Sequence, residues 1–118
     1  DASFISLTLL LPVLPALMQE EADLVCLIKP QFEAGRDKVG KNGVVRDKSV
    51  HQEVIRKVAD FGLELGLSPQ GLDFSPITGP KGNIEYLLHL VYAPGGERLS
   101  DQLIREMVEK AHLTLAQG

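Results

Sequence analysis

The clearest hydrophobic pattern in the chain is an unbroken apolar run from Leu24 to Ile28, which is short and rich in strand-forming residues. Such a run predicts a β-strand buried on both faces, of the kind found in parallel sheets. Lys29 and Pro30 end the run. A lysine at the carboxyl end of a buried strand lies where open α/β sheets place their ligands. The alternative is that Lys29 simply marks the point where the strand reaches solvent.

The best amphipathic helix is predicted over residues 48–65, where apolar residues recur at three- and four-residue steps. Asp47 or Ser49 can cap its start, and Gly66 is placed to end it. His51 lies off the apolar stripe, so the pattern predicts that it faces solvent.

Two further segments favour helix. Residues 99–116 carry a second amphipathic pattern, with Ser100 as the expected cap. Residues 7–20 are apolar over a helical length, although Pro12 and Pro15 argue against a regular helix.

The remaining strands are predicted over residues 67–75 and 83–92, joined by a loop rich in proline and glycine. A connection of this kind favours antiparallel neighbours, whereas a strand–helix–strand unit favours parallel pairing. His89 is expected to be a core or edge histidine. The predicted fold class is α/β: parallel strands with a terminal antiparallel strand, and helices packed on the sheet.

The composition limits the classes of function. The chain has 118 residues, the size of one small domain, and its 44% hydrophobic and 24% charged residues are ordinary for a globular protein. A net charge of −4 argues against electrostatic binding of nucleic acid by the whole chain. The lone Cys26 reads as a small core residue and fits a reducing, cytoplasmic location. The apolar stretch from Leu7 to Met18 is too short to span a bilayer, so no membrane segment is predicted.

One segment departs from this acidic balance. Residues 29–48 hold six basic and three acidic residues, so they carry a net charge of +3 while the rest of the chain carries −7. A basic loop on an acidic body is a candidate anion-binding site, and a solvated loop is an equally good interpretation.

Four phrases of the sequence carry a resemblance to a known family. They are DASFISL, LVCLIKPQFEAGR, GVVRD and SPITGPKGNIEYLLHL, in that order along the chain. These phrases resemble the carboxyl half of the TlyA family, which comprises hemolysins and ribosomal RNA 2′-O-methyltransferases with an FtsJ-like catalytic domain. The resemblance implies a partial Rossmann-like methyltransferase fold over residues 1–92, followed by a linker and an amphipathic helix over 93–118. Because the chain opens at Asp1 without a methionine, we also expect it to be the second half of a larger domain.

The resemblance implies catalytic residues. FtsJ-like enzymes use a Lys-Asp-Lys-Glu tetrad, whose last three positions map onto Asp1, Lys29 and Glu85. The first lysine and the glycine-rich loop that holds S-adenosylmethionine would lie upstream. The parent protein is therefore expected to methylate ribosomal RNA, and this chain alone is expected to be inactive.

Other positions follow from the same resemblance. The S-adenosylmethionine site is expected to involve Asp1, Ser3 and Phe4, and no metal is implied. Asn83 is a candidate to orient the substrate ribose, although a turn-forming asparagine is the simpler interpretation. Six residues are expected to contact RNA: Phe32, Arg36, Lys38, Lys41, Arg46 and Asn83.

The chemistry leaves two roles open for Lys29. A ribose 2′-hydroxyl is a poor nucleophile, so methyl transfer needs alignment of that oxygen and help in removing its proton. Lys29 can act as the base only if its pKa falls towards neutrality, or it can stay charged and stabilise the developing alkoxide. Asp1 and Glu85 are interpreted as orienting groups.

Two other classes of function stay open. The family's hemolysin name suggests a membrane-acting protein, although the sequence shows no strongly basic amphipathic helix. A non-catalytic RNA-binding or assembly module is the third possibility. Without upstream strands, the sheet is expected to expose apolar surface near residues 1–7 and 23–29, which predicts self-association into a homo-oligomer.

Overall fold

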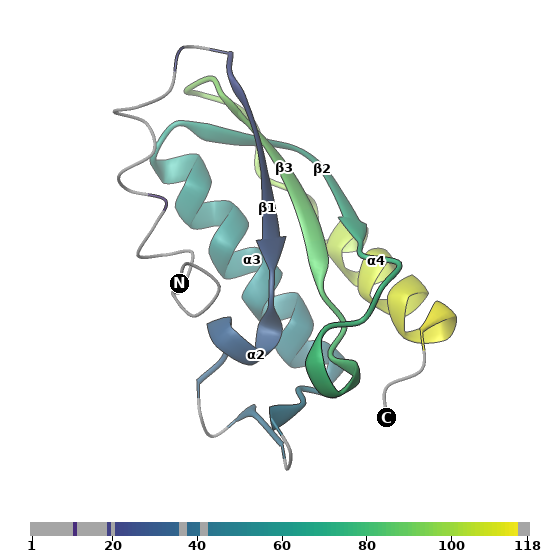
Figure 1. The fold of residues 1–118 in the computed structure, drawn as a ribbon. Helices are drawn as coiled ribbons and strands as arrows, with labels where there is room; N and C mark the ends of the chain where they lie inside the picture. The colour runs from purple at the N-terminus through teal and green to yellow at the C-terminus, as the bar shows by residue number, and fades with distance from the viewer. Residues whose placement is uncertain (1–10, 12–18, 20, 36–37, 41–42, 116–118) are drawn as a thin grey trace.

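The computed structural model describes residues 11, 19, 21–35, 38–40 and 43–115 (Figure 1). The predicted helix over 7–20 lies outside these residues except for Leu11 and Gln19, of which Leu11 is fully buried in the core. In chain order the elements are β1 (Asp23–Ile28), α2 (Pro30–Glu33), α3 (Lys48–Glu64), β2 (Leu67–Phe74), η6 (Pro80–Gly82), β3 (Tyr86–Tyr92) and α4 (Asp101–Thr114).

The three described strands form one sheet in the order β1-β3-β2. Both outer strands pair antiparallel with β3, so β1 and β2 run in the same direction without touching. The antiparallel neighbours predicted from the short loop are therefore confirmed. The prediction that β1 and β2, the strands of the strand–helix–strand unit, pair directly as parallel neighbours is wrong for the described strands. β3 lies between them and forms the hydrogen bonds that they would otherwise share. The mixed α/β class is confirmed.

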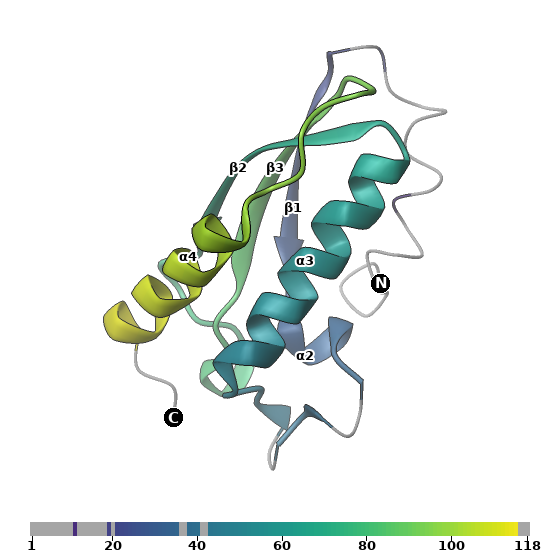
Figure 2. The same cartoon turned by 180° about the vertical axis from the view of Figure 1, so that it is seen from behind.

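Both long helices cover the same face of this sheet (Figure 2). Side chains from β1, β3, α3 and α4 share one aliphatic core, in which Ile28, Ile55, Leu88 and Val108 are fully buried. Cys26 belongs to this core, as predicted, and burial raises the pKa of its thiol to about 11. The thiol is thus a packing group rather than a nucleophile.

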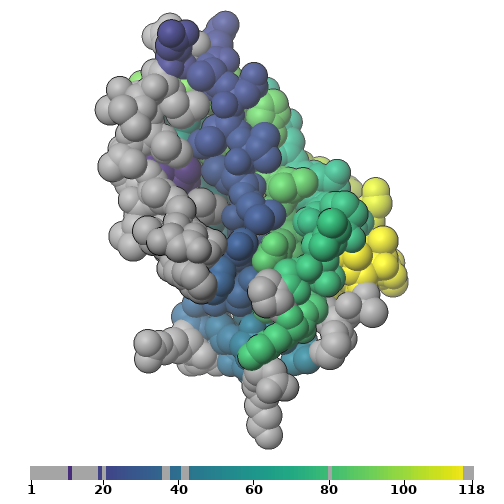
Figure 3. Space-filling view, viewed as in Figure 1, coloured from purple at the N-terminus to yellow at the C-terminus, as the bar shows by residue number. Residues whose placement is uncertain are grey.

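The opposite face of the sheet is open to view (Figure 3). Val25 and Leu27 of β1 are 63% and 39% exposed. A hollow of about 450 Å³ lies on this face and is bordered by Val25, Leu87 and His89, among other residues. The prediction that β1 is buried on both faces is therefore wrong, because the described helices cover only one face.

Local sequence signals explain where α3 begins and ends. Asp47 caps α3 by accepting the Ser49 N–H at 2.8 Å. Gly66 ends the helix with a φ of 86°, a conformation that costs glycine little. The caps and the amphipathic pattern of α3 were therefore predicted correctly from sequence.

The other two helices are explained in the same way. Ser100 caps α4 by accepting the Leu103 N–H at 3.0 Å, as predicted. The short helix α2 was missed, since the sequence predicted an irregular loop there. Pro30 at its first position is well suited to begin a helix.

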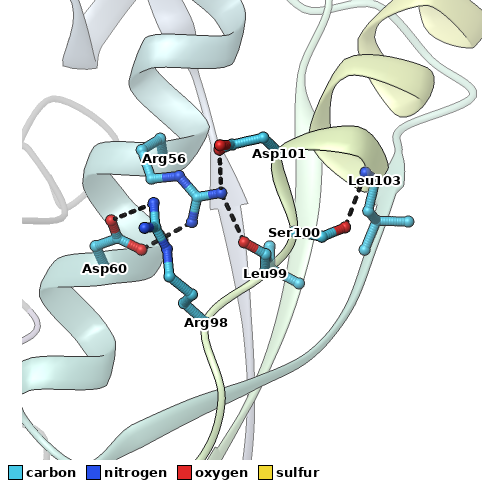
Figure 4. A network of polar contacts seen from close by, with 7 residues as sticks. All are labelled: Arg56, Asp60, Arg98, Leu99, Ser100, Asp101 and Leu103. Atoms are coloured by element: carbon cyan, nitrogen blue, oxygen red, sulfur yellow. Dashed lines mark hydrogen bonds and ion pairs between the residues drawn. The ribbon is translucent and has the colours of Figure 1, made fainter.

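A polar clamp joins α3 to the start of α4 (Figure 4). Arg56 donates to the Asp60 carboxylate at 2.9 Å, to the Leu99 carbonyl at 2.6 Å and to the Asp101 carboxylate at 2.6 Å. Its side chain is only 19% exposed, so these bonds are partly shielded from water. The clamp fixes the angle at which α4 leaves the loop after β3.

Among the described residues, no helix has the length and apolar character needed to cross a membrane.

Candidate active site at the carboxyl edge of the sheet

Lys29 and Glu85 lie at the same end of two neighbouring strands. Lys29 directly follows β1 and Glu85 directly precedes β3, while the last residue of β1, Ile28, is the register partner of Tyr86, the first residue of β3. The two candidate catalytic residues therefore extend neighbouring antiparallel strands at the same end. This edge also carries α2, η6 and the start of α3, which gather at the lower end of Figure 1.

Glu85 is held in place by its surroundings. It is only 6% exposed, and its Oε2 accepts a hydrogen bond from Gln31 Nε2 at 3.0 Å. Its backbone carbonyl accepts the Ser75 N–H at 2.8 Å. Gly79 packs so closely on the carboxylate that a Cβ there would collide with it. The glycine of the ITGPKG phrase thus makes room for Glu85.

Lys29 is positioned by the start of α2. Its backbone carbonyl accepts the Phe32 N–H at 2.9 Å, and its Nζ lies 5.5 Å from the centre of the Phe32 ring. An ammonium over an aromatic face is stabilised in its charged form. Phe32 itself is 36% exposed at the surface beside this lysine. The pair presents a cation and an aromatic ring together at the sheet edge, a combination that suits a nucleotide.

Asn83 joins this edge to the segment before α3. Its Oδ1 accepts the Val45 N–H at 3.1 Å, and its Nδ2 donates to the Gly43 carbonyl at 2.9 Å. The residue is only 3% exposed. Both ends of the amide thus hold the backbone that leads into Arg46. The ribose-orienting role of Asn83 stays a prediction.

The basic segment is partly neutralised by acids on the helices. Lys38 pairs with Glu53 of α3 at 2.8 Å, and Lys48 pairs with Glu109 of α4 at 3.1 Å. All four side chains are exposed by about half, so these ion pairs are weak and a phosphate can compete for the lysines.

The structure describes one of the three other basic candidates. Arg46 is exposed at the same end of the molecule. Arg36 and Lys41 lie outside the described residues.

Sequence reasoning missed a buried polar pair behind this edge. His51 is fully buried, so the prediction that it faces solvent is wrong. Its two ring nitrogens lie 2.7 Å from the Tyr86 hydroxyl and 2.7 Å from the Val45 carbonyl oxygen. Burial lowers the pKa of His51 to about 4 and raises that of the Tyr86 phenol. The signal available in sequence was weak, because a polar residue outside a helix's apolar stripe usually faces water.

The cofactor side of the candidate site rests on residues that the structure does not describe. Asp1, Ser3 and Phe4 all lie outside the described ranges. Within those ranges, Lys29 and Glu85 offer a cation and a carboxylate, which suit an acceptor hydroxyl rather than a positively charged sulfonium. The described residues contain no cluster of His, Cys, Asp and Glu that could hold a metal ion.

Comparison with known proteins identifies the family of the chain. Residues 1–92 match the FtsJ-like methyltransferase family, which covers most of the chain and includes both Lys29 and Glu85. The chain belongs to the FtsJ-like methyltransferase family. The TlyA and hemolysin resemblance of its sequence phrases is thereby confirmed.

Individual FtsJ-like relatives carry two kinds of name. The chain is 51% identical over 119 residues to the "Putative rRNA methyltransferase YqxC" of Bacillus subtilis, covering 98% of this chain and 42% of the relative. It is 46% identical over 90 residues to the "16S/23S rRNA (cytidine-2'-O)-methyltransferase TlyA" of Mycobacterium tuberculosis, covering 76% of this chain and 34% of the relative. It is 38% identical over 91 residues to "Hemolysin A" of Brachyspira hyodysenteriae, covering 77% and 38%.

Solved structures of FtsJ-like relatives show the same fold. A "Putative hemolysin from Streptococcus thermophilus" aligns over 97% of this chain and 41% of its own, with a TM-score of 0.90 and 46% identity. A second hemolysin of that name, from Lactococcus lactis, aligns over 93% of this chain and 52% of its own, with a TM-score of 0.83 and 47% identity. The chain thus spans about half or less of the length of the relatives it matches.

Proposed function

We propose that this chain is the carboxyl-terminal part of an S-adenosylmethionine-dependent methyltransferase that acts on the ribose 2′-hydroxyl of ribosomal RNA. The observation that carries the proposal is the placement of Lys29 and Glu85 at the same end of two paired strands, directly beyond the register pair Ile28 and Tyr86. Family membership and the names of the TlyA relatives support the reaction and the substrate. Residues 1–92 form the methyltransferase part in this proposal, and residues 93–118 form a linker and a packed helix.

In this proposal Lys29 acts on the acceptor oxygen. Its amine either removes the hydroxyl proton during attack or remains an ammonium that stabilises the developing alkoxide. Glu85, held by Gln31, orients the amine or the ribose. Alignment of the attacking oxygen is the remaining requirement, and a rigid sheet edge meets it.

S-adenosylmethionine, when bound, supplies a methyl group on a positively charged sulfur. We assign Asp1, Ser3 and Phe4 to its binding by family resemblance. The relatives are about twice as long as this chain or longer, which supports the proposal that further cofactor-binding residues lie outside it and that the chain alone is inactive. Calorimetric titration of S-adenosylmethionine into this chain tests that part. We expect no binding, and micromolar binding would overturn it.

The RNA surface is proposed around Phe32 and Arg46, with Arg36, Lys38 and Lys41 added from the resemblance. Lysines and arginines there contact phosphates and give affinity without base specificity. A cytoplasmic location follows from a ribosomal substrate.

The direct test of the reaction uses the longer protein that contains this chain. Labelled S-adenosylmethionine and ribosomal RNA are supplied, and the methylated nucleoside is identified after digestion. We expect 2′-O-methylation, with at least about a hundredfold loss of rate in Glu85→Gln and no loss in the exposed control Glu97→Gln. Full activity of Glu85→Gln, or methylation on a base, would contradict the proposal.

Membrane lysis is the second candidate, because relatives of the chain carry the name hemolysin. Leakage of dye from anionic and neutral liposomes distinguishes the two functions. Dose-dependent leakage by protein that does not methylate RNA would favour lysis.

A further inference from the structure

His51 sits at the centre of a buried hydrogen-bond chain behind the candidate site. Its Nε2 lies 2.7 Å from the Val45 carbonyl oxygen, which can only accept, so Nε2 carries the ring proton. Its Nδ1 is then an acceptor, and the Tyr86 hydroxyl donates to it at 2.7 Å. Both nitrogens of a neutral, fully buried imidazole are thereby satisfied. The ring connects the first turn of α3 to the first residue of β3 and to the segment before α3.

Asn83 completes the chain from the other side. It accepts the N–H of Val45, the same residue whose carbonyl accepts from His51, and it donates to the Gly43 carbonyl. Segment 43–45 is therefore held by two side chains, one from α3 and one from the segment between η6 and β3. Buried and fully satisfied networks of this kind fix one arrangement, because any shift leaves a buried polar group unpaired.

The residues proposed to act on RNA lie directly beside this network. Arg46 follows Val45, and Glu85 precedes Tyr86. His51 is thus bonded to the residue before Arg46 through the Val45 carbonyl, and to the residue after Glu85 through the Tyr86 phenol.

We infer that His51 is a positioning residue, which acts through Val45 and Tyr86 to align the RNA-contacting segment with Glu85 at the sheet edge. This inference rests on the proposed methyltransferase function, and it assigns to His51 no contact with the RNA or the cofactor. A purely structural role is the competing explanation. The two differ in one respect: a structural role changes how much protein is folded, whereas a positioning role changes the kinetics of each folded molecule.

The test compares His51→Phe with two milder variants in the longer protein. His51→Phe keeps a ring and removes both bonds, Tyr86→Phe removes only the hydroxyl, and His51→Gln retains an N–H that can reach the Val45 carbonyl. His89→Phe, on the open face of the sheet, is the matched control. Amide hydrogen exchange at Val45 and steady-state methylation of ribosomal RNA are measured well below each variant's unfolding temperature, with rates divided by the folded fraction.

We expect His51→Phe to accelerate Val45 exchange at least tenfold and to lower kcat/KM for RNA at least tenfold, while the Kd for S-adenosylmethionine stays within twofold. His51→Gln is expected to restore most of the Val45 protection and of the kcat/KM for RNA. Unchanged exchange, or an unchanged kcat/KM in folded His51→Phe, would overturn the inference. If the wild-type protein does not methylate RNA at all, the proposed function fails, and the exchange result still decides whether His51 holds segment 43–45.

Discussion

His51 on the covered side of the sheet and His89 on the open side both lie in surroundings other than those the sequence predicts. His51, on the covered side, is fully buried and bonded at both nitrogens. His89, on the open side, has 44% of its side chain exposed and pairs with Asp23 at 2.7 Å. It is neither a core residue nor a residue of an edge strand, since β3 is the central strand. A polar residue is thus buried where the fold places hydrogen-bond partners within its reach. The polarity of its sequence neighbours does not decide this.

The same contrast holds for the apolar residues of β3. Leu88 and Leu90 point to the helices and are fully buried, whereas Leu87 borders the hollow on the open face. Successive side chains of a strand point to opposite faces, so one strand samples both environments. Both faces are rich in aliphatic residues, but only the face under α3 and α4 is packed by the described helices.

The largest expected effect separates two adjacent leucines. Leu88→Ala removes a fully buried side chain from the packed core and is expected to lower the free energy of unfolding by about 2–5 kcal/mol. Leu87→Ala, on the open face, is expected to cost about 1 kcal/mol or less. Urea unfolding of the two variants measures both. Equal losses would show that the two faces are equally packed in solution.

His51 predicts a pH dependence of stability with a definite sign. Burial lowers the pKa of His51 from 6.5 to about 4. The Val45 carbonyl and Asp47 raise this pKa, whereas His112 of α4 lowers it further. The Tyr86 hydroxyl also faces the ring. A histidine with a depressed folded pKa stabilises the fold above the unfolded value and loses that contribution as pH falls. We expect the free energy of unfolding to fall by about 3 kcal/mol as the pH falls from 6.5 to about 4.

The measurement is denaturant unfolding across that pH range. His51→Gln is expected to lose this part of the pH dependence, because it has no group that titrates there. His89→Gln is expected to keep it. A His51→Gln profile parallel to that of the wild type would contradict the buried, neutral state of His51.

The Arg56 clamp gives a smaller effect on the covered side. Arg56→Ala removes bonds to Asp60, Leu99 and Asp101 and is expected to cost about 1–3 kcal/mol. Arg98→Ala is the matched control, since Arg98 is more exposed and reaches Asp60 only at 3.4 Å, so its expected cost is about 0.5 kcal/mol or less. Thermal unfolding of both variants tests whether α4 is held by the clamp.

The smallest effect concerns the open face. We predict that this chain self-associates weakly through Val25 and Leu27, in line with the apolar exposure expected from sequence. Val25→Lys is expected to weaken the association about tenfold, because it puts a charge into that surface on both copies. Leu113→Lys, on α4 and 85% exposed in the wild type, is the control and is expected to leave it unchanged. Sedimentation of a strictly monomeric wild-type chain would contradict the prediction.

Much of the fold was readable from sequence because local signals agreed with one another. The caps at Asp47 and Ser100, the glycine at position 66 and the proline- and glycine-rich loop between β2 and β3 each indicated an element or a pairing. The position of β3 between β1 and β2 was not readable, because hydrophobic patterns set which residues are buried and not the order of strands.

The site divides in the same way. Lys29 and Glu85 are 56 positions apart in sequence. Only the family resemblance predicted that they belong to one site, and the strand register then placed them at the same end of neighbouring strands. The His51 network escaped notice because its partners are a backbone carbonyl and a tyrosine from distant segments, which no local pattern specifies.

The central claim is that Lys29 acts on the ribose hydroxyl at the edge it shares with Glu85. The most direct measurement is the single-turnover rate of ribosomal RNA methylation by the full-length protein that is proposed to contain this chain, with Lys29→Ala compared with Lys110→Ala on the exposed side of α4. We predict a loss of about 10²–10⁴-fold in Lys29→Ala, no change in Lys110→Ala, and an unchanged Kd for S-adenosylmethionine in both. A Lys29→Ala rate within about threefold of wild type would contradict the account, since the lysine would then have no part in the chemical step.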